Sequence, residues 1–455
     1  MNNIKTALIM IKRIIVFIWE TFIHAFKTVR SPRESIKQIY GISFYRNSGY
    51  LVANSGITLL LGLVFNILIA RIYSASDVGY GSALISVLTF LSFAGTLGFG
   101  YYVVRYLPAA NNKTKLLNSL LTIASLAGAV ACLIFLSGIS WWSPRLLFLV
   151  QKPYFFIAFV IFGVTTTVYS IITSVFISFR MSGYTLLSQG IIASALELVL
   201  VIVMSVFGVF GIFASQGIAL AVSLVICLLI FLPRIIPHYR PIPAVQWNAT
   251  RETLSYSSAN FASDGLGNLP VWVLSLLVLN NFGAETNAYF YMAWTMSGAL
   301  LAIAYGISTS LFAEGAHESR NMSRDLIRSL KLVLLVLVPA TVIMVVFGDK
   351  FLLLYGGTYS KEGTQVLRLF SLAALPSSIN FLYFSLARIE KWLKSLIFVS
   401  GAIALITIVS SYVLMPHFGI IGVGVSRLFA QTILLFFTVP KLMQRIKKGD
   451  SSISS

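Results

Sequence analysis

Four ionisable side chains lie inside long apolar segments of this sequence: Glu197, Asp264, Arg368 and Arg427. A charge at the centre of a bilayer costs about 2.5 to 3.5 kcal/mol unless it meets a partner or a wet cavity. Arginine presents a forked set of donors that suits a diphosphate, so Arg427 and Arg368 are candidates for anion binding. The two acids, Glu197 and Asp264, are then candidates for coupling or gating.

The segment around Asp264 has the composition of a cavity-lining helix. Its polar or helix-breaking residues are Ser258, Asn260, Asn268 and Pro270. We therefore predict that Asp264 and Asn268 line a cavity. The competing interpretation is that intramembrane charges pair across helices or reach an interface, and this is favoured for Arg368, which lies near the end of its segment. For the other three charges both interpretations stay open.

Polar residues also occur in the first long apolar segment, and Asn54 and Asn66 are its candidates for the cavity. Polar packing between helices explains these asparagines equally well. In the next segment, the glycine-rich stretch 94–100 favours close helix contact over a ligand-binding loop. The two cysteines, Cys132 and Cys227, fall in apolar segments and favour packing over a disulfide or a metal site.

The chain lacks the motifs of an enzyme that acts on sugars or phosphates. It contains no Asp-x-Asp pair, no zinc-type cluster of His or Cys, and no glycine loop ending in Lys. Its histidines are scattered over separate segments: His24, His238, His317 and His417. We therefore predict no catalytic residues, no metal site and no cofactor.

Composition places the chain in a membrane, because 58% of its 455 residues are hydrophobic and only 10% are charged. Apolar runs long enough to cross a bilayer recur along it. We predict about twelve spanning helices in an all-α polytopic fold, at 50–71, 79–103, 116–138, 154–178, 184–206, 210–233, 256–280, 288–312, 330–347, 364–386, 393–415 and 419–440.

The net charge of +19 follows membrane sidedness and does not indicate a nucleic-acid-binding face. If both termini are cytoplasmic, most basic residues fall on the inner side. The outer loops then hold only Arg71, Arg145, Lys152, Lys350 and Lys361. This pattern predicts a multi-pass protein of the inner (plasma) membrane. The leader 1–47 is basic and amphipathic, which predicts an interfacial helix, with a partly disordered leader as the alternative.

The chain also resembles itself. Aligning Gly56 with Gly265, and then Arg180 with Arg388 and Gly211 with Gly419, matches several spans of the first half to spans of the second. This predicts two pseudo-symmetric six-helix lobes, 48–235 and 255–441, joined by a cytoplasmic connector 236–254 and followed by a tail 442–455. Two lobes of the same orientation suit transport by alternating access.

Three segments resemble a known family: 47–108, which begins NSGYLVANSG; 354–376, LYGGTYSKEGTQVLRLFSLAALP; and 417–427, HFGIIGVGVSR. They are similar to the polysaccharide-biosynthesis flippases of the multidrug/oligosaccharidyl-lipid/polysaccharide exporter (MOP) superfamily. The resemblance implies a MATE-like fold that moves a polyprenyl-diphosphate-linked oligosaccharide to the outer leaflet for cell-surface polysaccharide such as lipopolysaccharide. It also implies an anionic head group bound in a cationic cavity.

Three alternatives stay open at this point. A cation-coupled multidrug exporter of the same superfamily would use Glu197 and Asp264 to hold a cationic ligand. A membrane-bound glycan enzyme would need acids that the sequence lacks, and a noncatalytic scaffold would not need intramembrane charges. The partners expected for a flippase are the lipid-linked saccharide and membrane lipids, with a glycan polymerase or glycosyltransferase as a protein partner.

Overall fold

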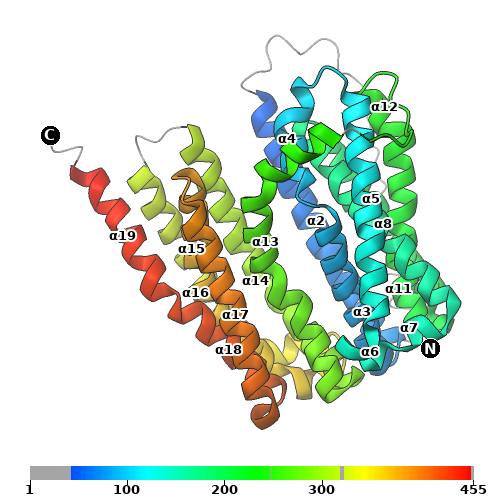
Figure 1. The fold of residues 1–455 in the computed structure, drawn as a ribbon. Helices are drawn as coiled ribbons and strands as arrows, with labels where there is room; N and C mark the ends of the chain where they lie inside the picture. Colours follow the sequence, from blue (N-terminus) through cyan, green and yellow to red (C-terminus); the bar gives the residue numbers. More distant parts are fainter. Residues whose placement is uncertain (1–41, 246, 318–321, 452–455) are drawn as a thin grey trace. The chain divides into compact units, whose positions relative to one another are not determined.

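The computed structural model describes residues 42–245, 247–317 and 322–451, and every regular element in these ranges is a helix (Figure 1). Twelve of the helical segments are long and apolar enough to cross a membrane, and one falls on each predicted span. The prediction of a multi-pass all-α protein is therefore confirmed. The predicted leader lies outside the described residues up to position 41, and the tail does so from position 452.

Packing of the Cα trace divides the chain into two compact units. Unit 1 runs to Leu68 and also contains Leu91–Gly138 and Phe148–Ser257, whereas unit 2 contains Ile69–Phe90, Ile139–Leu147 and the chain from Ser258 onward. The predicted lobe boundaries stay a prediction.

The helices of unit 1 follow from apolar runs interrupted at glycine and at polar turns. They are α2 (Ile42–Ile72, whose last residues belong to unit 2), α4 (Phe99–Tyr106), α5 (Lys113–Ser137), α7 (Phe148–Gln151), α8 (Pro153–Ser178), α9 (Ser182–Thr185), α10 (Ser194–Val203), α11 (Val209–Ile226) and α12 (Leu232–Ile235). Two π-helical segments, Leu186–Ala193 and Cys227–Phe231, precede α10 and follow α11. Buried side chains of α4, α5, α8 and the Cys227–Phe231 segment form its core.

The glycine-rich stretch 94–100 ends one helix and begins another. Helix α3 (Ala75–Gly95) stops where Leu97 and Gly98 adopt positive φ angles of 50° and 74°. Just before the break, a Cβ on Gly95 would lie 2.6 Å from the Cα of Gly128 in α5. Close helix contact is therefore the role of Gly95, as predicted.

Unit 2 is built from five long helices and two that share one span. They are α13 (Trp247–Phe282), α14 (Ala284–His317), α15 (Met322–Leu353), α16 (Gly357–Ile389), α17 (Leu393–Phe418), α18 (Ile420–Ile433) and α19 (Leu435–Ser451), with α6 (Ile139–Trp142) and most of α3 packed in the same unit. Helix α3 approaches α14 at Gly79. There the buried Asn287 donates to the Gly79 carbonyl at 2.8 Å and to Ser82 Oγ at 3.2 Å.

The helix boundaries test the internal repeat. Helices α3 and α14 begin at Ala75 and Ala284, in the same register as the aligned pair Gly56 and Gly265. Later in the chain the predicted alignment is wrong by three residues. Gly208 (φ 53°, ψ −129°) and Gly419 (φ 57°, ψ −143°) have matching backbone angles and directly precede α11 and α18.

The same register pairs two turns that end helices. Arg180 and Lys391 both have positive φ angles, 56° and 58°, in turns closed by equivalent backbone hydrogen bonds. Arg180 therefore corresponds to Lys391 and not to Arg388. Apolar sequences can be aligned in several registers, whereas a turn residue with a positive φ angle can be aligned only with the turn residue of the other half.

Candidate functional site

A cavity of about 500 Å³ lies within unit 2, among α13, α14, α16, α17 and α18. Its volume is typical of sites for small molecules, which span roughly 300 to 1,000 Å³. Three of the predicted site residues line it together: Asp264, Asn268 and Arg427. The sequence therefore found residues that the fold brings to one place from α13 and α18.

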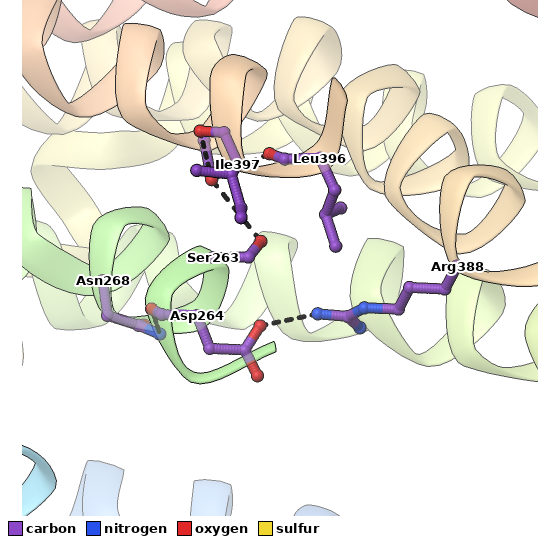
Figure 2. Close-up of polar contacts among 7 residues, drawn as sticks. Ser263, Asp264, Asn268, Arg388, Leu396 and Ile397 are labelled. Carbon is purple, nitrogen blue, oxygen red and sulfur yellow. Dashed lines mark hydrogen bonds and ion pairs between the residues drawn. The ribbon is translucent and has the colours of Figure 1, made fainter. Parts of the chain in front are cut away.

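Asp264 is paired in this cavity. Its Oδ1 accepts a hydrogen bond from Arg388 Nη2 at 2.6 Å, and Figure 2 shows the two side chains directed at each other from α13 and α16. The side chains are 31% and 28% exposed, so the ion pair remains in contact with the cavity. Arg388 lies in the last turn of α16, and its guanidinium is engaged by Asp264.

Neighbouring polar groups hold the α13 segment that carries Asp264. Asn268, one turn further on, donates from Nδ2 to the backbone carbonyl of Asp264 at 2.9 Å. Ser263 points the other way, toward α17, where Ser400 Oγ lies 3.4 Å from its hydroxyl (Figure 2). Asn268 thus supports the helix at Asp264 while its side chain lines the cavity.

Arg427 is held by aromatic rings. Its Cζ lies 3.9 Å from the ring centroid of Trp294 on α14 and 5.7 Å from that of Phe370 on α16. A cation over an aromatic face is stabilised by the ring quadrupole, most strongly over tryptophan. Within the described ranges no carboxylate pairs with Arg427. Its charge is therefore oriented but not neutralised.

Arg368 does not line the cavity. Its Nε donates at 2.9 Å to the carbonyl of Val345 in α15. Helix α15 departs from helical geometry at Phe347 (φ −101°, ψ 15°), which disturbs the hydrogen bonds of its last turns. Arg368 thus satisfies a carbonyl next to this kink, and its interpretation as a charge that pairs across helices or reaches an interface stays a prediction.

The other three candidates lie in unit 1. Asn54 is buried, and its Nδ2 donates weakly to Gln189 Oε1 at 3.4 Å, while its Oδ1 has no partner in the described part of the chain. Asn66 is buried further along α2. Glu197 is half-buried at the start of α10, directly after the π-helical segment, and among the described residues no cation pairs with it.

Sequence reasoning missed several residues of the cavity. Besides Arg388, these include Trp294, Gln431 and an aromatic group formed by Tyr305, Phe381 and Phe384. Gln431 could have been predicted from the sequence, because it lies one helical turn after Arg427 and therefore on the same face of the helix. Across the described ranges no group of three or more His, Cys, Asp or Glu side chains could hold a metal ion.

The fold is shared with solved transporters. The chain superposes on an inward-facing multidrug resistance MATE family transporter of the MOP superfamily with a TM-score of 0.66 and 12% identity, covering 87% of this chain and 96% of that one. A mutant of the Vibrio cholerae MATE transporter VcmN gives a TM-score of 0.63 and 15% identity over 89% and 97%. The class is thus a multi-pass membrane protein with the MATE-like fold, as predicted.

The particular family follows from sequence. A family model described as polysaccharide biosynthesis protein matches residues 68–362, so the chain belongs to that family. No curated protein sequence matches the chain. Family and fold together define a membrane transporter of polysaccharide biosynthesis and not an enzyme.

Proposed function

We propose that this protein is a flippase that moves a polyprenyl-diphosphate-linked oligosaccharide from the cytoplasmic to the outer leaflet by alternating access. The observation that supports this most directly is Arg427, a cation inside a spanning segment that lines a cavity and lacks a carboxylate partner in the described ranges. A diphosphate is too costly to desolvate unaided, and an arginine fork meets it with charge-assisted hydrogen bonds.

The rest of the cavity suits the saccharide. The hydroxyls of Ser308, Ser377 and Thr407 line it. Each donates to a carbonyl of its own helix and can accept a hydrogen bond from a sugar hydroxyl, and the amide of Gln431 adds a further polar group. The lipid tail stays in the bilayer while the head group crosses. Both termini are cytoplasmic in this proposal, and a glycan polymerase or glycosyltransferase supplies or receives the saccharide.

The proposal is tested by flipping in liposomes. A defined polyprenyl-diphosphate-linked oligosaccharide is incorporated with the purified chain, and its exposure in the far leaflet is measured with a lectin, with and without ion gradients. Arg427→Ala is expected to slow flipping about hundredfold, as for loss of a buried charge partner. The matched control is Gln216→Ala, because Gln216 follows Gly208 at the distance at which Arg427 follows Gly419.

Equal flipping by the wild type and Arg427→Ala would overturn the role of the cavity. Absence of flipping by the wild type with this lipid would overturn the flippase itself. Membrane insertion and monodispersity are checked for each variant, so that loss of folding is separated from loss of transport.

The second candidate is a cation-coupled multidrug exporter. Two observations favour it: Glu197 in α10 pairs with no cation among the described residues, and solved structures of the same fold are multidrug resistance MATE transporters. Against it, Asp264 is occupied by Arg388 and is not free to hold a cationic ligand. Uptake of a cationic dye by the same proteoliposomes, driven by a proton or sodium gradient and lost in Glu197→Gln, would favour the exporter.

A further inference from the structure

A second hollow of about 640 Å³ lies apart from the cavity, at the turn between α16 and α17 and against α19. We call it the lysine pocket. Its lining residues are Lys391, Trp392, Leu393, Lys394, Ser395, Lys441 and Gln444. None of these residues lines the cavity or takes part in the proposed transport.

The lysine pocket lies where spanning segments end. The candidate spans Gly357–Ile389 and Leu393–Phe418 flank the turn, and the third, Ile420–Ile446, brings Lys441 to it near its own end. The ends of spanning helices lie at the depth of lipid head groups. Trp392 fits that depth, because tryptophan is enriched at membrane interfaces.

Lys441 is held in place by its neighbours. Its Nζ donates to Ser395 Oγ at 2.8 Å, and that hydroxyl lies 2.6 Å from the hydroxyl of Tyr383. The ammonium group also lies 4.1 Å from the ring centroid of Phe437 and 5.8 Å from that of Trp392. The charge is therefore fixed in the pocket and does not extend freely into solvent.

The turn itself is closed by a backbone hydrogen bond. Lys391 adopts a φ of 58°, and the Trp392 N–H donates to the Ala387 carbonyl at 2.8 Å, which closes a left-handed cap on α16. Lys391 and Lys394 are both exposed, on either side of Trp392. The turn thus presents two ammonium groups next to the fixed Lys441.

Acidic side chains in the described part of the chain do not neutralise the positive charge of the pocket. The nearest acid in sequence, Glu390, accepts from Arg445 Nε at 2.7 Å. Across the described ranges no carboxylate pairs with Lys391, Lys394 or Lys441. By contrast, the corresponding turn of unit 1 carries Arg180 followed by Met181, Ser182 and Gly183, without a lysine.

We propose that the lysine pocket binds the phosphate head group of an anionic membrane phospholipid. Basic pockets between spanning helices at an interface are suited to such head groups, and each lysine near the membrane surface adds attraction to an anionic leaflet. The bound lipid fixes the ends of α16, α17 and α19 at the interface. This inference does not depend on the cargo that the transporter carries.

The pocket contains its own reporter, Trp392. The full chain is placed in lipid nanodiscs, and tryptophan quenching by phosphatidylglycerol with brominated acyl chains is compared with quenching by brominated phosphatidylcholine. Subtracting the signal of Trp392→Phe isolates this one residue. Quenching by phosphatidylglycerol is expected to reach its half-point at about tenfold lower mole fraction.

Variants separate the pocket from general charge effects. The triple variant Lys391→Gln, Lys394→Gln and Lys441→Gln is expected to lose the preference for phosphatidylglycerol. The single variant Lys394→Gln, at an exposed side chain that the fold does not need, is expected to lose part of it. The control removes three lysines outside the pocket and is expected to retain it: Lys113→Gln, Lys115→Gln and Lys331→Gln.

Three results would overturn the inference. Equal quenching by the two lipids would show no head-group preference, and a preference that survives the triple variant would place the site elsewhere. In nanodiscs of phosphatidylcholine alone, inorganic phosphate is added and Trp392 emission is recorded. Saturation at micromolar phosphate would assign the pocket to a free anion and not to a lipid.

Discussion

The segments that the repeat aligns share helix starts but not the charges that line the cavity. With α3 aligned on α14, Ser55 stands where Asp264 stands in unit 2, and with Gly208 aligned on Gly419, Gln216 stands where Arg427 does. In the same register Ile177 takes the place of Arg388. Helix formation in a membrane needs only apolar length, so the fold tolerates either set, and the helices of unit 2 do not require the cavity charges in order to form.

The largest expected effect comes from moving the charge between the halves. Arg427→Gln is expected to slow flipping about hundredfold, and adding Gln216→Arg should not restore it, because only unit 2 provides Trp294 and the cavity around the cation. The measurement is the liposome flipping rate of the single and double variants. Recovery in the double variant would mean that the two halves are interchangeable.

A helix contact gives the next largest effect. Gly79 of α3 corresponds to Ala288 of α14 in the repeat, yet a Cβ on Gly79 would overlap the carbonyl of Ala284. Gly79→Ala is expected to lower the free energy of unfolding by about 1 to 3 kcal/mol, measured by thermal or denaturant unfolding in detergent. Gly62→Ala is the control, because a Cβ there meets nothing within 4 Å, and an equal loss in both variants would contradict the contact.

The ion pair of unit 2 should show coupling. Arg388→Ala leaves the Asp264 carboxylate without its partner and is expected to cost about 1 kcal/mol of stability. Adding Asp264→Asn should recover most of that loss. The control is Ile177→Ala, at the position in unit 1 that corresponds to Arg388, and Asp264→Asn should not recover any stability lost in that variant. A double-mutant cycle in unfolding experiments measures the coupling energy between Asp264 and Arg388. Additive effects of the two substitutions would show that the two side chains do not stabilise each other.

Glu197 is expected to give the smallest effect on cargo binding. It belongs to unit 1 and does not line the cavity, so Glu197→Gln should change the affinity for a lipid-linked saccharide by less than about twofold. Binding is measured by titration of the detergent-solubilised chain. A loss as large as that of Arg427→Gln would place Glu197 in the binding site and reverse the contrast between the halves.

The sequence predicted the fold well because hydropathy and length determine which segments can span a bilayer. It also singled out Asp264, Asn268 and Arg427, which the structure places in one cavity, since a polar residue costs free energy in a spanning helix and therefore stands out. Their role as site residues stays a prediction. Arg388 and Trp294 did not stand out. Arg388 sits at a helix end, where a cation is ordinary, and Trp294 is one aromatic among many in apolar segments.

The repeat was predicted in part. The register at Gly56 and Gly265 agrees with the helix starts, but the later pairing of Arg180 with Arg388 does not. Matches between apolar helices carry little register information, whereas positive φ angles at Arg180 and Lys391 determine the register through the backbone. Such angles are not visible in residue types when the turn residue is not glycine.

The central claim is that the cavity of unit 2 holds the cargo, and a thiol placed there tests it directly. Ala302→Cys is made in the exposed cavity wall, with the two buried native thiols removed by Cys132→Ala and Cys227→Ala. Saturating polyprenyl-diphosphate-linked oligosaccharide is expected to slow alkylation of this thiol at least about tenfold, and adding Arg427→Ala should abolish the protection. Unchanged alkylation in the presence of the cargo would contradict the account.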